Sequence, residues 1–156
     1  MSSARGLAGH HLYLARLLLR AWQRDVEAEE VPVRTLAEAF GPACHTHLQR
    51  AYGWFLLALL NLDHHPEQPP ATTATLPELP VGRVLPPEVC EFRQLERGGW
   101  LADMLSWQPM VPGRAPRVAG NLASAPPAAT GLQDFDNWAQ QLDEYFQRMS
   151  TFIEEY

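Results

Sequence analysis

The last quarter of the chain carries the pattern that most restricts the possible folds. Seven large apolar residues recur there at alternating spacings of three and four: Phe135, Trp138, Leu142, Tyr145, Met149, Phe152 and Tyr156. Residues with this spacing lie on one face of an α-helix. An apolar face of that size is stable in water only when it is buried. The pattern therefore predicts a helix over about 132–155 that packs against other parts of the chain.

A second amphipathic helix is predicted over about 7–29. Its apolar residues follow the same alternation: Leu12, Ala15, Leu19, Trp22 and Val26. Two helices that each bury one apolar face are typical of a helical bundle. The first 24 residues carry four arginines and no acid, whereas 134–156 contains six acidic residues and one arginine. We therefore expect these two helices to be neighbours.

A third helix, over about 35–63, is apolar on most sides. Such a helix is either the central helix of a bundle or part of an oligomer contact. Thr35 and Glu38 have the spacing of a capping box, which marks a helix start. Gly41-Pro42 predicts a kink or a restart, because proline lacks the backbone N–H. A fourth helix is predicted over about 88–108, with a bend or a break near Gly98-Gly99, since glycine is a poor helix former.

Two long connections contain most of the 14 prolines. Seven prolines lie in 66–87 and five in 109–130, and this composition resists both helix and sheet. With 156 residues, 46% of them hydrophobic, the chain can bury one ordinary core. The sequence thus predicts an all-α fold: a single four-helix bundle-like domain over 1–156 with two long Pro-rich connections.

The composition excludes several classes of function. All 12 basic residues are arginine, so the chain cannot form a lysine Schiff base or supply the lysine of a phosphate-binding loop or a Ser/Lys hydrolase. The net charge of −6 argues against nucleic-acid binding, which needs a basic surface. The longest apolar run, 51–60, is shorter than the ~18 residues of a membrane span. Since no catalytic motif is present either, we expect a cytoplasmic protein that is not an enzyme and binds no cofactor.

Three residues are candidates for a metal site. Cys44 and His47 lie one turn apart in the predicted 35–63 helix, and His11 approaches them if the first two helices pack antiparallel. Zinc and similar ions bind three or four such nitrogen and sulfur ligands. The known helical metal motifs are absent, so no metal is predicted, and these three residues stay an open alternative. The thiols of Cys44 and Cys90 are both expected to be free and buried.

The five tryptophans are candidates for the core or for a binding surface. Trp22 and Trp138 lie in the apolar faces of their helices and are expected in the core. Trp54, Trp100 and Trp107 lie toward the flanks of theirs. Because tryptophan is enriched in protein interfaces, these three form a possible partner surface if they are exposed.

Four segments together resemble a known family. They are HLYLARLLL over 11–19, HLQRAYG over 47–53, WLADMLSW over 100–107 and the closing helix around Trp138. They are similar to segments of an uncharacterised family of small helical proteins, of about this length, from pseudomonads and related gammaproteobacteria. The resemblance implies an all-helical domain of unknown function and no particular functional residues.

The favoured hypothesis is a non-enzymatic adaptor or regulatory protein. It would act through protein–protein contact, or as a homodimer formed through the apolar 35–63 helix. One alternative is a helical bundle that binds a metal or a small ligand in its core. Another is peripheral association with a membrane through the basic N-terminal helix.

Overall fold

A computed structural model describes residues 2–110 and 130–154, with side chains as far as residue 151. Within these ranges the chain forms helices and no strand, which confirms the all-α prediction. The elements are α1 (Ala4–Ala28), α2 (Val33–Leu60), the short 3₁₀ helix η1 (Thr73–Thr75), α3 (Pro87–Leu95), α4 (Trp100–Ser106) and α5 (Leu132–Glu154).

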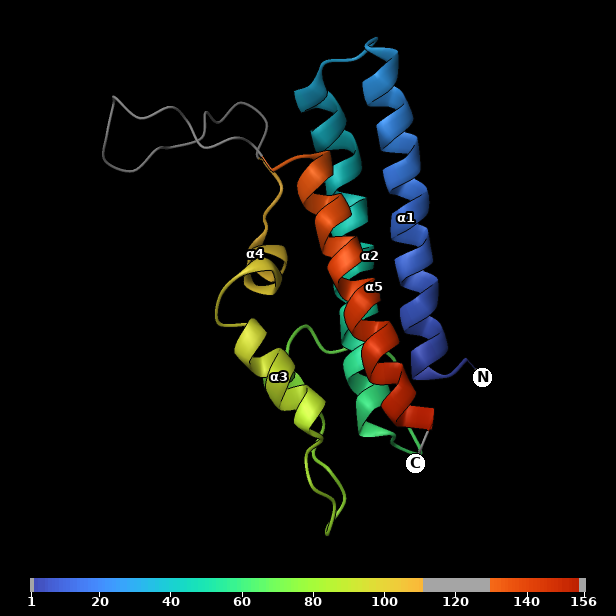
Figure 1. Ribbon diagram of the computed structural model, residues 1–156, viewed down its shortest axis with the longest axis vertical. Helices are drawn as coiled ribbons and strands as arrows, with labels where there is room; N and C mark the ends of the chain where they lie inside the picture. Colours follow the sequence, from blue (N-terminus) through green and yellow to red (C-terminus); the bar gives the residue numbers. More distant parts are fainter. Residues whose placement is uncertain (1, 111–129, 155–156) are drawn as a thin grey trace, which may run out of the picture.

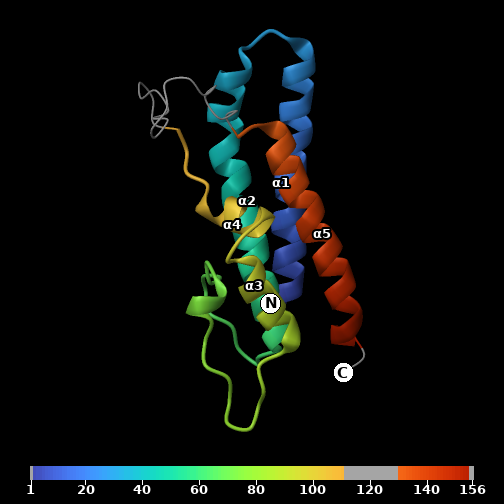
Figure 2. The same cartoon turned by 60° about the vertical axis from the view of Figure 1, so that its left-hand side comes forward.

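Three long helices form the body of the bundle. α1 and α2 are an antiparallel hairpin, and α5 lies along both of them (Figure 1). α3 and α4 pack against α2 on the side away from α1, as the turned view in Figure 2 also shows. The expected contact between the basic first helix and the acidic last helix is present, because Arg16 Nη2 lies 3.0 Å from Asp143 Oδ2.

The two predicted apolar faces point into the core. On α1, all but one of the predicted residues are buried, and Val26 is partly buried. On α5, Phe135, Trp138, Leu142 and Met149 are at most 5% exposed, whereas Tyr145 is partly buried. The side chains of Phe152 and Tyr156 lie outside the described residues.

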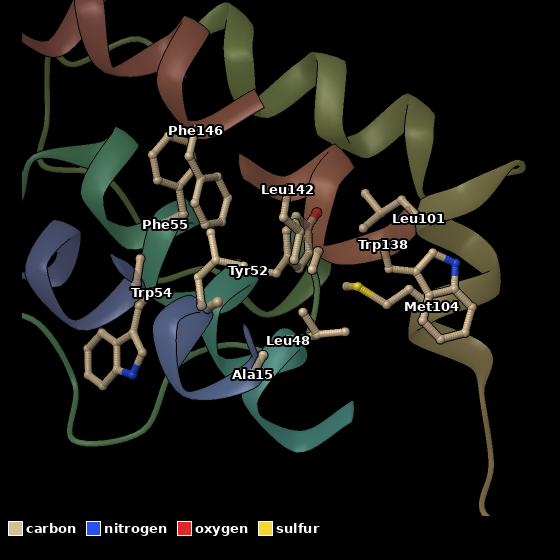
Figure 3. Close-up of a cluster of buried hydrophobic side chains, with 14 of the residues drawn as sticks. Ala15, Leu48, Tyr52, Trp54, Phe55, Leu101, Met104, Trp138, Leu142 and Phe146 are labelled. Carbon is tan, nitrogen blue, oxygen red and sulfur yellow. The ribbon is translucent and has the colours of Figure 1, made fainter. Parts of the chain in front are cut away.

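α2 is the central helix. Its last ten residues, 51–60, are buried with one exception, Ala58, which is half-buried. Figure 3 shows Tyr52 and Phe55 of α2 close to Leu142 and Phe146 of α5. The apolar surface that suggested an oligomer contact is therefore covered by the protein's own helices and connections, and the central-helix alternative is correct.

The predicted capping box is wrong, because Thr35 lies inside α2 instead of capping it. A kink or a restart was predicted at Gly41-Pro42; α2 runs unbroken from Val33 through Pro42, so there is no restart, and the kink stays a prediction. The missing N–H of Pro42 costs one backbone hydrogen bond, which the buried residues on both sides of it offset. The bend or break predicted near Gly98-Gly99 is a break, because Gly99 adopts a φ of 89° that no helix accommodates.

The first Pro-rich connection is packed on α2. A Cβ at Gly53 would overlap the backbone oxygen of Pro70, so only glycine admits this close approach. Further along, the backbone N–H and the hydroxyl of Thr73 donate to the Glu96 carboxylate at 2.8 and 2.7 Å. The Tyr52 hydroxyl donates to the same carboxylate at 2.5 Å. The connection is thereby fixed to both α2 and the end of α3. Most of the second connection, 111–129, lies outside the described residues.

Candidate functional site

The three tryptophans predicted as a partner surface lie in different surroundings. Trp54 is only 5% exposed and belongs to the core, where its ring meets that of His65 edge-on at a centroid distance of 5.1 Å. It is therefore not part of an exposed surface. The position of Trp54 on the flank of its helix does not make it exposed, because α2 is buried on nearly every side. Trp100 and Trp107 are half-buried and stand at the two ends of α4.

Trp100 and Trp107 line a pocket together with Trp138. This tryptophan pocket, of about 660 Å³, lies between the N-terminal part of α2, α4 and the start of α5. Trp138, which was predicted in the core, is 5% exposed and lies beside Leu101 and Met104 of α4 (Figure 3). Its indole thus serves both the core and the pocket wall.

Ring contacts fix the pocket tryptophans in place. The Trp100 ring lies 5.7 Å from that of Tyr145, measured between centroids. The Trp107 ring meets Phe135 edge-on at 5.3 Å and the ring of His45 at 4.9 Å. His45 also fastens α4 to α2, because its Nε2–H donates to the Met104 carbonyl at 2.7 Å. Burial of His45 lowers its pKa, which favours the neutral ring in this contact. The pocket walls are therefore held rigidly before any ligand arrives.

The charged groups of the tryptophan pocket are mostly acidic. Three carboxylates, those of Glu38, Asp103 and Asp134, face one guanidinium, that of Arg34. Arg34 is paired with Glu38 at 3.4 Å, and Asp134 accepts a hydrogen bond from the backbone N–H of Gly131 at 2.9 Å. Asp103 has no side-chain hydrogen bond or ion pair to any residue in the described ranges. The pocket thus combines aromatic walls with a negative charge that no cation within the described residues pairs with.

The position of Asp103 has a local signal in the sequence. Trp100, Asp103 and Trp107 follow spacings of three and four, which places a carboxylate between two tryptophans on one side of a helix. The contribution of Trp138 had no such signal, because it comes from a helix about thirty residues further along the chain. The contact of His45 with α4 is likewise visible only in the fold.

The predicted approach of His11 to His47 is present. Their Nδ1 atoms lie 3.0 Å apart, and the two rings stack at a centroid distance of 5.3 Å. Burial lowers both pKa values, and the nearby positive charges of Arg50 and His10 lower them further; for His11 the charge of His47 is a larger cause than either. Both rings are therefore favoured in the neutral form, in which one Nδ1–H donates to the other Nδ1.

Cys44 does not complete a metal site with this pair. Its thiol is buried and points to the Ala15 carbonyl, with a sulfur–oxygen distance of 3.9 Å. Burial raises the pKa of the thiol to about 12, so the sulfur is protonated when no metal is bound. No group of three potential ligands is found in the part of the chain that the structure describes. The other thiol, Cys90, was expected to be buried but is exposed.

The basic face of α1 lines a shallow groove against α5. Arg16, Arg20 and Arg24 contribute to it, and Arg16 is already paired with Asp143. The apolar face of α1 is used in the core, which leaves Tyr13 and Leu17 as the large apolar residues exposed on this helix. Membrane association through α1 would thus depend mainly on its arginines. Among the described helices, none has the length and apolar character needed to traverse a bilayer.

Comparison of the chain with protein-family models, with curated proteins and with solved structures gives no match. The resemblance to small helical proteins of pseudomonads stays a prediction.

Proposed function

We propose that this protein is a non-enzymatic binding protein, and that the tryptophan pocket is where it docks a basic segment of a partner protein. The observation that carries the proposal is the joint position of Trp100, Trp107 and Trp138 around one acidic pocket. Trp100 and Trp107 are half-buried and held in place, and such tryptophans are typical anchors of protein interfaces.

The chemistry of the walls supports binding more than catalysis. The pocket is lined by indole rings, carboxylates, one guanidinium, and amide, hydroxyl and aliphatic side chains, with no histidine or cysteine among its described lining residues. Histidine is the most frequent general base and cysteine a frequent nucleophile, so two common catalytic groups are absent from this lining. A basic partner is favoured because opposite charges steer association and an acidic segment would be repelled by Asp103.

Site-specific photo-crosslinking tests the proposal. A benzophenone amino acid replaces Ser106, an exposed residue of the pocket lining, and in a control it replaces Asp63, an exposed residue beyond the opposite end of α2. After irradiation in the native cell, the crosslinked partner peptides are identified by mass spectrometry. We expect Ser106 to capture a basic peptide that the Asp63 position does not capture.

A charge-reversal pair then measures how much the pocket contributes. Asp103→Arg places a cation in the pocket, and Asp63→Arg makes the same charge change away from it. With the purified partner, we expect Asp103→Arg to weaken binding at least tenfold and Asp63→Arg to leave it unchanged. Equal binding by the two variants, or crosslinked peptides without basic residues, would refute the proposed docking site.

A further inference from the structure

We infer that the group recognised inside the tryptophan pocket is a single organic cation, a guanidinium or an alkylammonium, that stands against the indole rings and pairs with Asp103. The inference rests on the proposed function and names the chemistry of the anchor that the partner inserts. It follows from three properties of the pocket: the type of its rings, the state of its charges and its rigidity.

The rings favour a cation. Trp100, Trp107 and Trp138 all contribute to the pocket wall, and indole is the aromatic side chain that attracts cations most strongly. A guanidinium can also stack flat on an indole, which an ordinary ammonium cannot do. Ala37 and Pro42 add aliphatic surface to the same lining, and the methylene stem of a long basic side chain can cover it.

The charges favour a cation over a neutral or anionic group. Glu38 is paired with Arg34, and Asp134 accepts a hydrogen bond from the backbone at the start of α5. Asp103 alone among these carboxylates has no partner within the described residues. A neutral occupant would remove water from this carboxylate without returning an opposite charge, whereas an anion would be repelled by it. A guanidinium returns both the charge and the donors.

Rigidity lowers the cost of binding. Each of the three rings packs against a further ring, those of Tyr145 and Phe135, so little side-chain freedom remains to be lost. The pocket volume of about 660 Å³ lies in the usual range for small-ligand sites and is ample for one arginine side chain.

NMR of the indole N–H groups tests the inference on the full chain. The five tryptophans give five signals, which single Trp→Phe variants assign. Three belong to the pocket, and the two core tryptophans, Trp22 and Trp54, are internal controls. The probes are N-acetyl-arginine amide and its neutral counterpart N-acetyl-citrulline amide, which has nearly the same shape.

We expect the arginine probe to shift the signals of Trp100, Trp107 and Trp138 and to leave those of Trp22 and Trp54 in place. The citrulline probe should bind at least tenfold more weakly. Asp103→Asn should weaken arginine binding several-fold, and Asp63→Asn should not. Equal affinity for arginine and citrulline, equal shifts at all five tryptophans, or no shift with either probe would overturn the inference.

A third probe separates the source of the cation from its chemistry. Benzyltrimethylammonium is a free organic cation, and it is compared with the peptide captured by crosslinking at Ser106. Tighter binding of the peptide supports a cation carried by a protein. Equal binding of the free cation supports the cation site and refutes the partner-protein function. If the basic peptide binds but its citrulline version binds equally well, the docking function stands and the cation inference fails.

Discussion

Replacement of Gly53 by alanine tests whether the first Pro-rich connection packs on α2 as the structure shows. Gly53 lies inside α2, where Pro69-Pro70 approaches the helix closely. A Cβ at this position would overlap the backbone oxygen of Pro70 and would lie 2.9 Å from the Cβ of Pro69. The obstacle is backbone in a stiff proline pair, which cannot rotate aside as a flexible side chain can. The connection must therefore move away from α2 in the variant.

Opposing terms set the size of the effect. In a helix interior, alanine is more favourable than glycine by about 0.8–1.0 kcal/mol. Overpacking of a tight contact costs about 1–3 kcal/mol. Movement of the connection also weakens the hydrogen bonds from Thr73 to Glu96, each worth about 1 kcal/mol or somewhat more. We expect Gly53→Ala to lower the free energy of unfolding by about 1–3 kcal/mol.

Gly9 offers a matched control. It lies inside α1, and a Cβ added there has no atom within 4 Å. Gly9→Ala should therefore show only the helix-propensity gain of about 0.5–1 kcal/mol. Urea unfolding followed by tryptophan fluorescence measures both variants, and hydrogen exchange at the Thr73 amide reports on the connection itself. If Gly53→Ala is as stable as the wild type while Gly9→Ala gains stability, the packing of Pro70 on Gly53 is wrong.

Two further perturbations test polar contacts in the bundle. Glu96→Gln replaces one carboxylate oxygen by a donor, so a hydroxyl of Tyr52 or Thr73 loses its acceptor. Urea titration should show that the free energy of unfolding falls by about 1–3 kcal/mol. Unchanged stability would mean that this carboxylate does not hold the connection. In the folded chain the pKa values of His11 and His47 lie below the ordinary 6.5. At a pH between the lowered values and 6.5, the unfolded chain therefore binds more protons than the folded chain. Stability from this pair is therefore complete above 6.5 and is lost as the pH falls through the lowered pKa values. The urea midpoint should fall more between about pH 7.5 and about pH 5 for the wild type than for His11→Gln, and equal falls would contradict the geometry of the pair.

The long amphipathic helices could be predicted from the sequence because their pattern is local. A face that repeats at three and four residues must be buried, whichever element covers it. The prediction fell short at Phe146, which lies one position beyond Tyr145 in the pattern. Phe146 is 7% exposed and stacks on Phe55 of α2 at a centroid distance of 4.0 Å. Only the position of α2 shows that the buried face of α5 includes more residues than the three-and-four spacing predicts.

The packing of the first Pro-rich connection could not be predicted from its composition. Proline indicates that the segment is neither helix nor sheet, but it does not indicate where the segment lies. Its position depends on Gly53 meeting Pro70 and on Thr73 meeting Glu96, pairs that are about twenty residues apart in the sequence. Such contacts leave no periodic signal, since each depends on one shape and one hydrogen-bonding group.

The break between α3 and α4 connects the fold with the proposed site. Because Gly99 leaves the helical region of backbone space, α4 begins again at Trp100 and buries Leu101 and Met104. The same short helix carries Asp103 on its exposed side, in the wall of the tryptophan pocket. Packing of the core accounts for the leucine and the methionine. It gives no reason for a carboxylate that stands between two half-buried tryptophans and has no partner among the described residues. Binding of a cation accounts for both the rings and the charge.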